Sequence, residues 1–227
     1  MTLQHVDILF QLIVFLFAIS VHESAHAWMA NRCGDPTARM LGRISLNPIK
    51  HIDIFGTILL PLICVLTHIP VLGWAKPTPV DPRNFKNPVK DDILTAVVGP
   101  TSNFIVAFAA TIVLLAVKLS SAFGAQTVYG VMFGMISSQS NSFLVPFCFF
   151  IYQLLVINVV LAVFNLIPVP PLDGSHVLRH FMPESARRTY DMIGWFGLLA
   201  LVYFGGGILS RIISPFLAFF THIILAI

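Results

Sequence analysis

The chain has 227 residues, of which 57% are hydrophobic and 10% are Asp, Glu, Lys or Arg. Its formal net charge is +3 and its mean hydropathy is +0.87. This composition excludes an ordinary soluble domain and predicts an all-α polytopic membrane protein embedded in the lipid bilayer. The Lys and Arg residues lie in loops between apolar tracts and form no basic stripe, so we expect no nucleic-acid partner.

Five apolar tracts follow one another along the chain. They are Ile8–Ala30, Ile54–Trp74, Ile93–Val117, Phe143–Val169 and Met192–Ile227. At about 1.5 Å per residue, a helix of 20 residues spans a hydrocarbon core of about 30 Å. Because Gly205–Gly207 interrupts the last tract, we expect five to six membrane segments. The prediction is a single membrane-embedded domain over residues 1–227, with its core motifs in 21–174 and accessory helices in 184–227.

Two segments, one between the first two tracts and the other the second tract itself, depart from a simple helical pattern. Arg39–Asn47 alternates apolar and polar residues, which favours a short strand or β-hairpin at the membrane surface. Such an exposed strand could hold an extended peptide by β-addition. Ile54–Trp74 is interrupted by Pro61, so it is a candidate for a re-entrant segment.

The first tract contains the motif His22-Glu23-Ser24-Ala25-His26. Two His residues at i and i+4 lie about 40° apart on one helix face, so both imidazoles can bind one zinc ion. The Glu beside the first His stays free to hold a water. Ionisable groups at this depth cost at least ~2.5 kcal/mol each unless they are paired or metal-bound. The motif therefore predicts two zinc ligands, His22 and His26, and a catalytic base, Glu23.

The fourth tract ends in the sequence Asn165-Leu166-Ile167-Pro168-Val169-Pro170-Pro171-Leu172-Asp173-Gly174. Its prolines break the helix, so the freed backbone groups must face protein or a water-filled cavity. Asp173 directly follows this break. A catalytic zinc ion needs a third protein ligand and one open position for water, and Asp173 is the candidate for that ligand. The alternative for Asp173 is an N-cap of a short helix that begins near Gly174.

Together with Gly99-Pro100-Thr101-Ser102-Asn103, these motifs resemble the site-2 protease family of intramembrane zinc metalloproteases, in a short form without PDZ or cystathionine-β-synthase-like domains. The resemblance covers Val21 to Gly174. It implies one zinc ion per chain, held by His22, His26 and Asp173, with Glu23 as the catalytic carboxylate. It also implies that Asn165 contacts the substrate backbone. Asn103 carries over as a residue that shapes the substrate-binding site.

The resemblance implies a zinc metalloendopeptidase. Its substrates would be transmembrane proteins, cut within or next to their membrane segments in regulated intramembrane proteolysis. Two alternatives stay open: a membrane metal transporter, and a non-proteolytic protein that binds membrane helices. A transporter is expected to repeat its ligands in two halves of the chain, and a binding protein has no use for Glu23. The oligomeric state stays open.

The predicted zinc site constrains the topology. His22, His26 and Asp173 lie near the C-terminal ends of their tracts, so the first and fourth tracts must run in the same direction. Either one of the two tracts between them is re-entrant, for which Ile54–Trp74 is the better candidate, or Arg39–Asn47 dips into the membrane.

The distribution of Lys and Arg predicts the orientation of these segments. Eleven of them fall in residues 31–53, 73–92 and 179–188, against one in residues 118–142. By the positive-inside rule, we expect an integral multi-pass protein of a bacterial cell (inner) membrane. Its N-terminus would lie outside and its active site nearer the cytoplasmic face.

Overall fold

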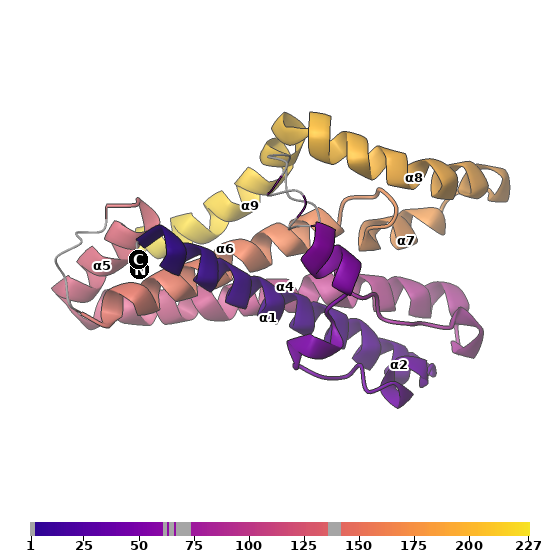
Figure 1. Ribbon diagram of the computed structural model, residues 1–227, viewed down its shortest axis with the longest axis horizontal. Helices are drawn as coiled ribbons and strands as arrows, with labels where there is room; N and C mark the ends of the chain where they lie inside the picture. The colour runs from indigo at the N-terminus through magenta and orange to yellow at the C-terminus, as the bar shows by residue number, and fades with distance from the viewer. Residues whose placement is uncertain (1–2, 61–62, 64–65, 67–73, 136–141) are drawn as a thin grey trace.

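The computed structural model describes residues 3–60, 63, 66, 74–135 and 142–227, and within these residues it contains helices and no strand (Figure 1). The long helices are α1 (Leu3–Cys33), α4 (Pro88–Ser120), α5 (Ala122–Met132), α6 (Leu144–Asn165), α8 (Glu184–Phe204) and α9 (Gly206–Ala226). A short helix, α7 (Asp173–Arg179), joins α6 to α8. Between α1 and α4 the described residues include the short elements α2 (Thr37–Met40), η1 (Pro48–Lys50), η2 (Ile54–Leu59) and η3 (Pro82–Asn84).

Among the described residues, four stretches are long and apolar enough to cross a membrane: Phe10–Cys33 within α1, and the whole of α4, α6 and α9. The chain is therefore a multi-pass membrane protein. Helices α1, α4 and α6 lie side by side along the long axis of the molecule, with α4 in contact with both of the others (Figure 1). Small residues on α4, Ala107 and Ala110, are fully buried in the core that α4 shares with α5, α6 and α9. Such residues let membrane helices approach closely.

The direction of the helices agrees with the topology predicted from the zinc site. Near the start of both helices, the Phe10 ring of α1 lies 6.2 Å from the Phe149 ring of α6. Near their other ends, His22 of α1 meets Asp173, which follows α6. Helices α1 and α6 therefore run in the same direction, and α4 runs antiparallel to both.

The chain between α1 and α4 leaves and returns at the same end of the bundle. Helix α1 ends at Cys33 because Gly34 takes a positive φ of 114°, which glycine adopts without strain. The Lys86 amide donates to the carbonyl of Cys33 at 3.2 Å, just before α4 begins. Asp35 accepts from the Asp81 amide at 2.8 Å. These contacts hold residues 81–87 against the C-terminal end of α1.

Within this connection, Trp74 returns to the start of η2. Its amide donates to the Gly56 carbonyl at 3.1 Å, and its carbonyl accepts from Thr57 Oγ1 at 2.8 Å. Trp74 therefore lies beside the start of η2. Most of the predicted re-entrant segment, including Pro61, lies outside the described residues.

The predicted strand or hairpin at Arg39–Asn47 is not confirmed. Arg39 and Met40 end α2, and the residues that follow form a turn and an irregular segment. Leu41 and Leu46 are exposed, whereas Arg43 is buried and its guanidinium donates to the carbonyls of Lys50 and Pro77. The alternation reflects an inward-pointing arginine that ties two loops together, and no described strand pairs with this segment.

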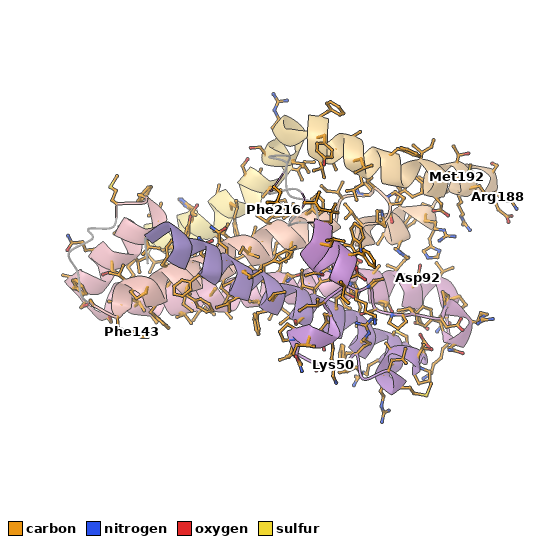
Figure 2. The ribbon with its side chains drawn as sticks, viewed as in Figure 1. Lys50, Asp92, Phe143, Arg188, Met192 and Phe216 are labelled. Atoms are coloured by element: carbon orange, nitrogen blue, oxygen red, sulfur yellow. The ribbon has the colours of Figure 1, made fainter. Side chains whose placement is uncertain are left out.

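The last apolar tract is divided as the glycines indicate. Helix α8 ends at Phe204 and α9 begins at Gly206. Only α9 qualifies as a membrane span, because the first half of α8 carries charged residues such as Arg188. Helix α8 extends away from the bundle, with Arg188 and Met192 near its outer end (Figure 2).

Candidate active site

His22 and His26 lie one turn apart on α1, and both are buried. Their Nε2 atoms are 3.0 Å apart. Asp173, the first residue of α7, places Oδ2 3.1 Å from His22 Nε2 and Oδ1 3.4 Å from His26 Nε2. One ligand atom from each residue lies within 4.8 Å of the others. The structure thus brings together the three residues that the sequence predicts as zinc ligands.

Helix α4 crosses α1 directly over the two imidazoles, at Gly99. A Cβ atom at this position would lie 2.8 Å from His22 Cε1 and closer still to the ring of His26. No side chain larger than hydrogen fits there without displacing a ring. The glycine of the second motif is therefore explained by this close approach of a backbone to the site.

Gly174 has a similar explanation at the other side of the site. A Cβ atom there would meet the Leu166 carbonyl and would lie 2.8 Å from the Ile167 carbonyl oxygen. The absence of a side chain lets the proline-rich turn fold back on the start of α7. Leu172, and not Asp173, is the N-cap of that helix. The carboxylate of Asp173 is directed at the two imidazoles, which contradicts the N-cap alternative.

The donor set fits a zinc ion. Two imidazole nitrogens and a carboxylate oxygen are ligands typical of catalytic zinc sites. Asp173 Oδ2 is buried and receives no hydrogen bond from the described residues. The two carboxylate oxygens of Asp173 face the Nε2 atoms of His22 and His26, and a cation between them would satisfy all three groups.

The partners of the other ring nitrogens fix the tautomers of both histidines. His22 Nδ1 lies 2.6 Å from Asn103 Oδ1, and His26 Nδ1 lies 2.6 Å from the Thr95 carbonyl oxygen. Both oxygens only accept hydrogen bonds, so each Nδ1 carries the proton. Each Nε2 then presents its lone pair to the cluster, which is the form that binds a metal ion.

Asn103 is itself held in one orientation. Its Nδ2 donates to the Ala18 carbonyl at 3.2 Å and to Asn158 Oδ1 at 2.8 Å, and Asn158 Nδ2 donates to the Leu154 carbonyl at 2.8 Å. Asn103 and Asn158 are both 0% exposed. The geometry therefore favours a role for Asn103 in orienting His22 over the predicted contribution to substrate binding.

The catalytic base predicted from the motif, Glu23, is half-buried and faces a segment that the sequence did not single out. Its Oε2 accepts hydrogen bonds from the Thr78 amide at 2.9 Å and from Thr78 Oγ1 at 2.7 Å. Thr78 belongs to a segment without regular secondary structure, residues 74–81, that precedes η3. Glu23 thus belongs to α1, but its carboxylate is held by hydrogen bonds from the loop between α1 and α4.

Asn165 is the last residue of α6 and is half-buried. Its Nδ2 donates to the Leu161 carbonyl at 2.9 Å, one turn earlier on the same helix. An amide also offers a second N–H and a carbonyl oxygen. Within the described part of the chain, no hydrogen bond joins Asn165 to the cluster of His22, His26 and Asp173.

A second set of contacts fastens α7 to the start of α4. Asp92 Oδ2 lies 2.7 Å from His180 Nε2 and 3.5 Å from His176 Nδ1, and Asp92 points from α4 toward α7 (Figure 2). The hydrogen bond with Asp92 raises the pKa of His176 above its usual value. Asp173 therefore begins a helix that is anchored at its C-terminal end to the same helix, α4, that covers the imidazoles.

Known proteins are similar to this chain over most of its length. The sequence profile of peptidase family M50 matches residues 10–204, which include every residue of the site. The chain is 35% identical over 206 residues to "Putative zinc metalloprotease YwhC" of Bacillus subtilis strain 168, covering 90% of this chain and 84% of that protein. It is 26% identical over 190 residues to "Putative zinc metalloprotease Rip2" of Mycolicibacterium smegmatis, covering 83% of this chain and 63% of that protein. No solved structure matches the chain significantly.

Proposed function

This chain belongs to peptidase family M50, the site-2 protease family of zinc metalloproteases, and from that premise we propose that it is an intramembrane endopeptidase. Its substrates are membrane proteins, which it cuts within or next to a transmembrane segment as a step of regulated intramembrane proteolysis. The observation that carries this proposal is the position of the cluster. His22 and His26 lie inside the span Phe10–Cys33, and Asp173 joins them from the far end of a parallel span.

Each residue has a chemical role in this proposal. His22, His26 and Asp173 hold the ion through two Nε2 atoms and a carboxylate. When bound, zinc supplies Lewis-acid chemistry, since it polarises a carbonyl group and acidifies water. Glu23 takes a proton from the attacking water and later returns it to the leaving amine. Asn165 donates to the carbonyl of the substrate backbone next to the bond that is cut.

The substrate must reach this site as an extended chain. The carbonyl groups of a transmembrane helix are already hydrogen-bonded within the helix, so the helix has to unwind locally before attack. Pro168, Pro170 and Pro171 lie between the end of α6 and Asp173. This break in helical structure offers a route for water. The excess of Lys and Arg at this end of the bundle supports a site nearer the cytoplasmic face of a bacterial cell (inner) membrane.

Cleavage of a model transmembrane peptide by the purified protein tests the proposal. Glu23→Gln should retain zinc and lose cleavage, because a carboxamide cannot accept the proton. Glu184 is the other Glu of the chain and lies exposed at the start of α8, so Glu184→Gln is the matched control and should cleave at the wild-type rate. Metal transport or helix binding that survives in Glu23→Gln, with no cleavage by the wild type, would support one of the two alternative functions instead.

A further inference from the structure

Thr78 contacts Glu23 through two donors on a single carboxylate oxygen. The Thr78 amide lies 2.9 Å and its Oγ1 2.7 Å from Glu23 Oε2. Oγ1 is also 3.0 Å from the Glu23 backbone carbonyl. A hydroxyl has one proton, and a charged acceptor binds it more strongly than a neutral one, so the carboxylate is the preferred acceptor.

We propose that Thr78 is the positioning residue for Glu23. This inference rests on the proposed function, in which Glu23 is the base. A Glu side chain turns about three single bonds, and a base must hold its oxygen within hydrogen-bond reach of the proton that it takes. Two donors on Oε2 hold that oxygen in place and leave Oε1 as the oxygen that accepts the proton.

The segment that carries Thr78 is itself anchored. Pro77 and Pro79 flank Thr78, fix their own φ angles and have no N–H, so the Thr78 amide is the one backbone donor of these three residues. The guanidinium of Arg43 donates to the Pro77 carbonyl at 3.3 Å. On the other side, the Lys76 amide donates to the His51 carbonyl at 2.8 Å. Thr78 is therefore presented to Glu23 from a fixed backbone.

Glu23 and the two histidines are oriented by different segments of the chain, and this has a consequence for catalysis. His22 and His26 orient their rings through α4, whereas the carboxylate between them in sequence is oriented through residues 74–81. Loss of the Thr78 hydroxyl should leave the zinc ligands in place and affect the proton transfer alone. The effect should therefore fall on kcat, with zinc content and KM unchanged.

The test compares Thr78→Val, which keeps the shape and the amide but removes the hydroxyl, with Thr78→Ser, which keeps the hydroxyl. The matched control is Thr111→Val, since the Thr111 hydroxyl bonds back along its own helix, α4, to the Ala107 carbonyl at 2.9 Å. We expect kcat to fall about tenfold in Thr78→Val, the effect of losing one hydrogen bond to a charged group. Thr78→Ser should restore most of that rate, and Thr111→Val should match the wild type.

Several outcomes would overturn the role of Thr78. They are an unchanged kcat in Thr78→Val, an equal loss in Thr78→Ser, or a loss of zinc in either variant. Hydrogen exchange supplies a readout that needs no activity: the Thr78 amide should exchange faster in Glu23→Ala than in the wild type. Equal exchange would refute the contact itself. A wild type that cleaves nothing refutes the proposed function, and the exchange experiment still decides whether Thr78 holds Glu23.

Discussion

Asn103 and His22 are 81 positions apart in sequence, yet Asn103 Oδ1 lies 2.6 Å from His22 Nδ1. Asn103→Ala removes this acceptor and frees His22 to adopt the other tautomer. Loss of such a partner of a metal-binding histidine lowers metal affinity by about 10- to 100-fold. Competition with a fluorescent zinc chelator measures the affinity.

Asn165→Ala is the matched control for that experiment, because Asn165 bonds to its own helix and not to a zinc-binding histidine. It should keep wild-type zinc affinity and lose turnover by a factor of ~10 or more, as expected when a donor to the reacting carbonyl is removed. Equal zinc affinity in Asn103→Ala and the wild type would contradict the orienting role of Asn103.

Asn158 should affect zinc affinity only through its hydrogen bond with Asn103. Its Oδ1 accepts from Asn103 Nδ2 at 2.8 Å, and both side chains are fully buried. We expect Asn158→Ala to weaken zinc binding less than Asn103→Ala does. The double variant should be no weaker than Asn103→Ala alone, because the two residues act in one chain of hydrogen bonds. Additive losses of binding free energy would mean that Asn158 acts on the site by another route.

Gly99→Ala should displace the two imidazoles, since the added methyl group would lie 2.8 Å from His22 Cε1 and closer to His26. The protein should be isolated with a strongly reduced zinc content, measured by atomic absorption. Gly197→Ala is the control, because its Cβ would make an ordinary contact of 3.5 Å with Val169. Full zinc occupancy in Gly99→Ala would show that α4 can move away from α1 at little cost.

Cysteine labelling tests the topology. In a variant without Cys33, Cys64 and Cys148, single cysteines at Met40 and Arg83 should share one accessibility, because both positions lie in the connection that returns to its own end of the bundle. A cysteine at Ser120, at the other end of α4, should have the opposite accessibility. With the site toward the cytoplasm, only Ser120→Cys should react with an external impermeant thiol reagent. Labelling of one but not the other of positions 40 and 83 would contradict the fold.

The sequence predicted the site residues that follow from helical spacing or from the free-energy cost of placing a charged group inside the membrane. His22 and His26 follow from the periodicity of a helix. Asp173 follows from a charge placed where prolines open a helix inside the membrane. Asn158 carried a similar signal, since it is an amide in the middle of the apolar helix α6.

Other parts had no such signal. Thr95 acts through its backbone carbonyl, which any residue possesses. Thr78 meets Glu23 from 55 positions away in sequence, and no local pattern signals such a contact. The strand predicted at Arg39–Asn47 failed because alternation does not tell which residues face inward, and here the buried one is Arg43.

Zinc content and peptide cleavage, measured on the same samples of wild type and Asp173→Asn, test the central claim most directly. We predict one zinc ion per chain and cleavage in the wild type, and neither in Asp173→Asn, because a neutral amide cannot replace the half-buried anion that faces the two Nε2 atoms. Asp191→Asn, which changes an exposed carboxylate on α8, should behave as the wild type. Stoichiometric zinc in Asp173→Asn, or cleavage by the metal-free wild type, would contradict the account.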